Sequence, residues 1–222
     1  CYEQMMYQSL LGTRLDSLPI VAIPGNHEYL KGVVKTLPKQ WKTIFPNPQN
    51  GPARFLGTTY FVDFPHLRLI AIDTDGLHRM SDYTQVAFWL KKTLREAGDK
   101  FTIVMMHHPV YSTAKGRQNP LMWLTFYGAM READVVFSGH DHNYARRTEY
   151  YKERFWKKEE PTVFIGTNAS IKKYPVKENK KYEASLSGES VYEYIYVTPN
   201  TLHISTYTIH LGERIDNVEI IR

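Results

Sequence analysis

The chain has 222 residues, of which 42% are hydrophobic and 23% charged, and its formal net charge is +5. These values are typical of a globular protein and exclude disordered, collagen-like and coiled-coil chains. A mean hydropathy of −0.44 and the lack of an apolar run of about 18 residues exclude a transmembrane helix.

The termini and the charges leave the compartment and the partners open. Cys1 is the only cysteine, so no internal disulfide can form, and the first ten residues show no secretory signal. The basic residues at 152–158 alternate with glutamates, and those at 172–181 lie among loop residues. We interpret both runs as solvated surface, with an electrostatic funnel for an anion as the alternative. Nucleic-acid binding has only the isoelectric point of about 9.1 in its favour, because no motif that reads nucleic acid is present.

Several elements are expected in the first third of the chain. In order they are a helix over Tyr2–Leu15, a short apolar strand over Ile20–Ile23, a surface excursion over 38–64 that is rich in Pro, Gly and Asn, and strands over Thr59–Val62 and Leu67–Asp73. The clearest helix covers Asp82–Ala97, with an apolar stripe, Ser81 or Asp82 as its cap and Gly98 at its end.

Two runs in the middle of the chain, Phe101–Met106 and Val135–Ser138, are apolar on both faces, as strands of a buried parallel sheet are. A helix is expected between them over Leu121–Glu132. Later strands are expected to be antiparallel, at Thr162–Ile165, Tyr192–Thr198, Leu202–Thr208 and Val218–Ile221, with a hairpin turn at Pro199-Asn200. This order predicts an α/β (α+β) protein with a mixed sheet or a two-sheet sandwich.

Three apolar strands end in polar segments that contain histidine. The segments are Gly25-Asn26-His27-Glu28, His107-His108-Pro109 and Gly139-His140-Asp141-His142. Ligands bind at the carboxyl ends of parallel strands, and imidazole is the commonest protein ligand of transition metals. His140 and His142 are two apart in a segment expected to be extended, so both should face one side. Together the three segments predict a metal site.

The same segments, read with Val104-Met105-Met106-His107, resemble the last three signature blocks of the calcineurin-like metallophosphoesterases, in particular the purple acid phosphatase-like branch. The resemblance covers roughly residues 18–150. It implies a four-layer α/β/β/α sandwich, two transition metals (Fe, Zn or Mn) and hydrolysis of small phosphate monoesters by a metal-bound hydroxide, with diesters and nucleotides as open alternatives. It also favours an exported protein, without a membrane span.

The resemblance implies a role for each matched residue. Asn26, His107 and His140 would bind one metal and His142 the other. His27 would act beside the substrate phosphate, and Glu28 would orient His27 or a metal ligand. His108 lies at a position that is not a ligand in the family and is expected to contact substrate or to be structural.

Two earlier blocks of the family, which carry an Asp-x-His or Asp-x-Gly and a Gly-Asp, have no counterpart here. We therefore expect residues 1–222 to be one partial phosphoesterase domain that lacks its N-terminal strand units. An upstream segment or a second chain would have to supply the bridging carboxylate. The alternative function is a non-catalytic remnant that binds metal or phosphate.

Four further residues are candidates for the site or for its structural surroundings. Arg117 lies in the loop after His107 and is expected near substrate, while Tyr144 either lines the pocket or packs in the core. Asp73 and Asp75 end a predicted strand and are interpreted as structural.

Overall fold

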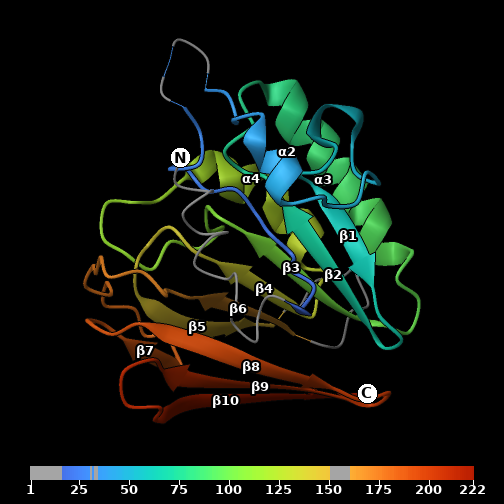
Figure 1. Ribbon diagram of the computed structural model, residues 1–222. Helices are drawn as coiled ribbons and strands as arrows, with labels where there is room; N and C mark the ends of the chain where they lie inside the picture. The colour runs from blue at the N-terminus through green and yellow to red at the C-terminus, as the bar shows by residue number, and fades with distance from the viewer. Residues whose placement is uncertain (1–16, 31, 33–34, 151–160) are drawn as a thin grey trace.

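The computed structural model describes residues 17–30, 32, 35–150 and 161–222 (Figure 1). The helix expected over Tyr2–Leu15 lies outside this part of the chain. Its elements are α2 (Gln40–Ile44), the 3-10 helix η2 (Ala53–Phe55), β1 (Tyr60–Asp63), β2 (Leu67–Ile72), α3 (Met80–Arg95), β3 (Phe101–Met106), α4 (Pro120–Met130), β4 (Val135–Ser138), β5 (Tyr144–Glu149), β6 (Thr162–Gly166), β7 (Ala184–Leu186), β8 (Val191–Val197), β9 (Thr201–Thr208) and β10 (Arg214–Ile221). No helix among the described residues is long and apolar enough to cross a membrane.

Seven strands form the main sheet, in the order β1-β2-β3-β4-β6-β5-β7. The central strands β2, β3, β4 and β6 run parallel, whereas β1, β5 and β7 are antiparallel to their neighbours. In register, Met106 of β3 lies opposite Ile72 of β2 and Ser138 of β4. The residues that follow these three strands therefore emerge side by side at one edge of the sheet.

Helices α3 and α4 cover one face of this sheet, and the three-stranded sheet β10-β9-β8 packs against the other (Figure 1). Side chains alternate between the two interiors along β3: Val104 packs toward the helices, and Phe101 and Ile103 pack toward the second sheet. The expected α/β class with a mixed sheet is confirmed. The described residues provide three layers of the expected sandwich, α/β/β.

Side chains cap the N-termini of α3 and α4, but α3 does not begin at the cap that the sequence predicts. That helix begins after Arg79, and Asp82 accepts hydrogen bonds from the Arg79 and His78 backbone amides at 3.0 and 3.2 Å. Helix α4 begins after Asn119, whose side chain accepts from the Met122 amide at 3.2 Å.

Ile20–Ile23 does not form the expected strand, because it pairs with no described strand. Side chains satisfy its backbone instead: the Ala22 carbonyl accepts from Tyr60 Oη at 2.8 Å and from Asn47 Nδ2 at 3.4 Å. The segment therefore reaches the site without the backbone hydrogen bonds of a paired strand.

Two other expectations were wrong in detail. Strand β6 pairs antiparallel with β5, as expected, but it also pairs parallel with β4, and all five of its residues are buried in the middle of the sheet. Residues 38–64 are not a simple surface excursion. They contain α2 and η2, and they bury Trp41, Phe45 and Phe55.

Candidate metal centre

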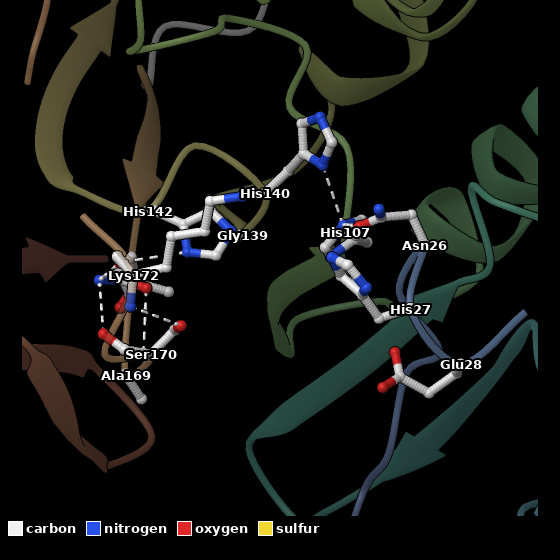
Figure 2. A pocket seen from close by; sticks show the side chains of 12 residues that line it. Asn26, His27, Glu28, His107, Gly139, His140, His142, Ala169, Ser170 and Lys172 are labelled. Carbon is white, nitrogen blue, oxygen red and sulfur yellow. Dashed lines mark hydrogen bonds between the residues drawn. The ribbon is translucent and has the colours of Figure 1, made fainter. Parts of the chain in front are cut away.

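A cavity of about 510 Å³ lies at the carboxyl ends of β3 and β4. Most of the expected site residues line it, namely Asn26, His27, Glu28, His107, His140 and His142. Figure 2 shows Asn26, His27 and His107 on one side, with His142 and Lys172 opposite. Residues 167–170 and Lys172 also line the cavity.

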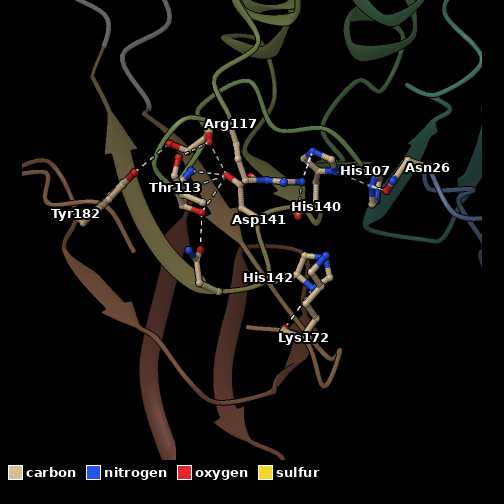
Figure 3. A network of polar contacts seen from close by, with 12 residues as sticks. Asn26, His107, Thr113, Arg117, His140, Asp141, His142, Lys172 and Tyr182 are labelled. Carbon is tan, nitrogen blue, oxygen red and sulfur yellow. Dashed lines mark hydrogen bonds and ion pairs between the residues drawn. The ribbon is translucent and has the colours of Figure 1, made fainter. Parts of the chain in front are cut away.

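Three of the expected ligands converge on one another. His107 Nε2 lies 2.8 Å from Asn26 Oδ1 and 3.0 Å from His140 Nδ1 (Figure 3). The backbone around them is close: a Cβ on Gly25 would lie 2.8 Å from His107 Nδ1, so only glycine fits there. The parallel register of β3 and β4 brings His107 and His140 together, and the side-chain hydrogen bonds to the Ala22 carbonyl hold the segment that carries Asn26.

The two imidazoles are held in their neutral form. Burial first, and then the neighbouring imidazoles of His108 and His140, together lower the pKa of His107 to about 3. The pKa of His140 also falls to about 3, chiefly through burial and then through the nearby His108 and Arg117. Neutral imidazole is the form that ligates a metal, so no proton has to be displaced near neutral pH.

The donor set fits a cation. Arg117, a permanent donor, contacts His140 Nε2 at 2.5 Å, which places the hydrogen of the neutral ring on Nδ1. That hydrogen points at His107 Nε2 and occupies its one lone pair, so Asn26 Oδ1 faces the same nitrogen with no hydrogen between them. A metal ion would satisfy Asn26 Oδ1 and, once the His140 hydrogen shifts from Nδ1 to Nε2, both imidazoles as well; nitrogen and amide oxygen suit a transition metal.

His142 lines the same cavity but stands apart from this trio. Its Nδ1 lies 3.2 Å from the Lys172 carbonyl oxygen, and its ring lies edge-on to Tyr174 with centroids 5.2 Å apart. The segment is not extended as expected, because His140 and His142 both have positive φ, 66° and 52°. The left-handed backbone, and not strand alternation, aims the two rings into the cavity.

Glu28 lies at the cavity, and Tyr144 occupies the second of its two expected places, the core. Glu28 Oε2 accepts from the Gly25 amide at 2.7 Å and so closes the turn that carries Asn26. Tyr144 is buried in the core between the sheets, where its hydroxyl donates to Asp216 at 2.6 Å, and it does not line the cavity.

Sequence reasoning missed Asp141, which fixes the loops around the site. Its buried Oδ2 accepts from Ser112 Oγ at 2.7 Å and from the amides of Thr113 and Ala114 at 2.6 and 3.2 Å, and its Oδ1 pairs with Arg117 Nε at 3.2 Å (Figure 3). An acidic residue between two histidines was the only signal in the sequence.

The family model of the calcineurin-like phosphoesterases matches residues 2–144. A glycerophosphodiester phosphodiesterase, GpdQ, of Enterobacter lignolyticus (strain SCF1) is 27% identical over 133 residues, which make up 56% of this chain and 45% of that protein. Two solved structures have a similar fold. GAP50, the anchor in the inner membrane complex of Plasmodium, has a TM-score of 0.54 at 18% identity over 73% of this chain and 52% of its own. PhoD has a TM-score of 0.50 at 9% identity, over 75% and 41%. The chain thus spans about half the length of each of these proteins.

Proposed function

Because the chain belongs to the calcineurin-like phosphoesterase family, we propose that it hydrolyses phosphate esters with transition-metal ions held at the ends of β3 and β4. The observation that carries the proposal is the convergence of Asn26, His107 and His140, whose ligating atoms lie 2.8 and 3.0 Å apart. A bound transition metal would supply an acidified water and would polarise a phosphoryl oxygen.

Three other residues of the cavity are proposed to bind the second metal ion and the substrate. His142, on the opposite wall, is proposed to hold the second ion of a dinuclear centre. His27 is exposed at the cavity and is proposed to donate to a phosphoryl oxygen or to the leaving group. Lys172 lines the same wall and supplies positive charge that suits an anionic ester.

We propose small phosphate monoesters as the substrates. A cavity of about 510 Å³ admits a small ester, and its wall between Asn168 and Lys172 is polar. GpdQ is a diesterase by its name, so diesters are the competing substrate class.

A dinuclear centre of this kind needs carboxylate ligands in addition. The cluster of potential metal ligands among the described residues holds histidines only, and Glu28 and Asp141 are already engaged by backbone amides. We propose that an upstream segment or a second chain supplies the acids.

Metal-free protein, loaded in turn with Zn²⁺, Mn²⁺ or Fe²⁺, would be assayed on p-nitrophenyl phosphate and on bis-p-nitrophenyl phosphate, with bound metal counted by elemental analysis. Asn26→Ala and His140→Ala should each abolish metal-dependent hydrolysis, whereas His203→Ala, on the distant strand β9, should not. Normal turnover in either site variant would refute the ligand assignment. Metal binding without hydrolysis of either ester, in protein that includes the segment or chain supplying the acids, would favour the non-catalytic remnant, and greater activity on the diester would correct the substrate class.

A further inference from the structure

A third histidine stands beside His107 and His140. The ligand atoms that His107, His108 and His140 can offer all lie within 4.8 Å of one another. The ring centroids are 4.4 Å apart for His108 and His140 and 5.1 Å apart for His107 and His108. Three imidazoles thus surround one point at the ends of β3 and β4.

One side of the His108 ring is fixed by the segment that follows β2. His108 Nδ1 lies 3.1 Å from Thr74 Oγ1 and 3.5 Å from Asp75 Oδ2, and the His108 amide donates to the same Thr74 oxygen at 3.0 Å. The ring is therefore held at both its backbone and its Nδ1 edge.

Asp75 is an unusual carboxyl. Its side chain is fully buried, and neither oxygen accepts a hydrogen bond from a described residue. Lys35 approaches Oδ1 only to 3.8 Å, from an exposed position. Burying an acid without hydrogen bonds is costly, so a partner at His108 Nδ1 offsets part of that cost. The sequence predicts a structural role for Asp75. Its contact with His108 Nδ1 places it where it can orient the His108 ring.

The tautomer of His108 follows from these neighbours. A carboxylate beside Nδ1 favours the hydrogen on that nitrogen, which leaves the lone pair on Nε2 at the opposite edge of the ring. Histidines that bind metals characteristically donate their other N–H to a carboxylate or carbonyl. In this structure His108 Nδ1 has Thr74 Oγ1 at hydrogen-bond distance, 3.1 Å, and the Asp75 carboxylate just beyond it at 3.5 Å.

We propose that His108 is a third histidine ligand, through Nε2, of the metal held by His107 and His140, and that Asp75 is the positioning residue that fixes its tautomer. The inference rests on the proposed function and adds to it a ligand that the family resemblance does not assign. Three neutral nitrogens favour Zn²⁺ or a similar borderline ion over Mg²⁺ or Ca²⁺.

The test measures metal binding and not activity. Zn²⁺ affinity of the metal-free full chain would be measured by chelator competition, and imidazole ligands would be counted by X-ray absorption at the zinc edge. Wild type should show three imidazoles and His108→Ala two. Asp75→Asn should lower Zn²⁺ affinity about 10–100-fold, and His108→Ala should lower it at least as much. His203→Ala is the matched control and should bind as wild type does.

The outcomes separate this inference from the proposed function. If His107→Ala loses zinc while His108→Ala and Asp75→Asn bind it like wild type, the three-histidine site is overturned and the proposed function stands. If His107→Ala also binds like wild type, both fail. Should His108→Ala fail to fold by circular dichroism, Asp75→Asn decides the question, because it removes a buried charge without leaving a void.

Discussion

Replacing Asp141 with alanine should destabilise the protein by about 3–5 kcal/mol. The substitution leaves the buried amides of Thr113 and Ala114 without an acceptor, at a cost of about 1–3 kcal/mol each. It also removes the acceptor of Ser112 Oγ and leaves Arg117 without its buried partner. Because these contacts join the loop after β3 to the loop after β4, the loss falls on the two loops that carry His107 and His140.

Urea unfolding followed by circular dichroism would measure this difference on metal-free protein. Asp141→Asn keeps an amide oxygen for the backbone donors and should cost less, about 1–3 kcal/mol. Asp99→Ala, at an exposed position, should lie within about 0.5 kcal/mol of wild type. If Asp141→Ala unfolds at the same urea concentration as Asp99→Ala, the hydrogen bonds drawn in Figure 3 do not stabilise these loops.

Three further predictions concern the centre itself. Arg117→Gln should tighten Zn²⁺ binding about tenfold, because it removes a cation that holds the hydrogen of His140 on Nδ1; calorimetric titration showing equal or weaker binding would contradict this. His27→Ala should lower kcat with bound metal unchanged by elemental analysis, whereas loss of metal would make His27 a ligand. Without metal, the free energy of unfolding should fall as the pH drops from about 6.5 toward 3. The unfolded chain takes up protons near pH 6.5, but folded His107 only near pH 3. Urea titrations across this range should show a shallower slope for His107→Gln, and an unchanged slope would refute the assignment.

The main sheet could be predicted where composition alone determines a strand. Phe101–Met106 is apolar at every position but one, and in the structure it is buried on both faces. Strand β5 could not be predicted, because its central Arg146 and Arg147 oppose a strand assignment until their partners are known. Asp216, seventy residues away, pairs with Arg146 at 2.5 Å, and no local sequence pattern predicts such a pair.

The candidate centre shows the same division. Asn26, His107 and His140 could be predicted because each follows an apolar run, where a polar side chain contributes little to packing. The contact between Asp75 and His108 could not be predicted, since it depends on the parallel register of β2 and β3. Likewise, the turn at His140 departs from the extended form, since it lies between the end of β4 and the start of β5.

The left-handed histidines have a consequence for how this sequence changes over generations. Each non-glycine residue in that conformation costs about 1–3 kcal/mol, and His140 and His142 both adopt it. Glycine at either position would relieve the cost, so selection for folding alone favours losing both histidines. In a lineage that no longer needed the metal site, these two histidines would be among the first residues to be replaced. Their retention in a set of homologues would therefore report continuing selection on the site.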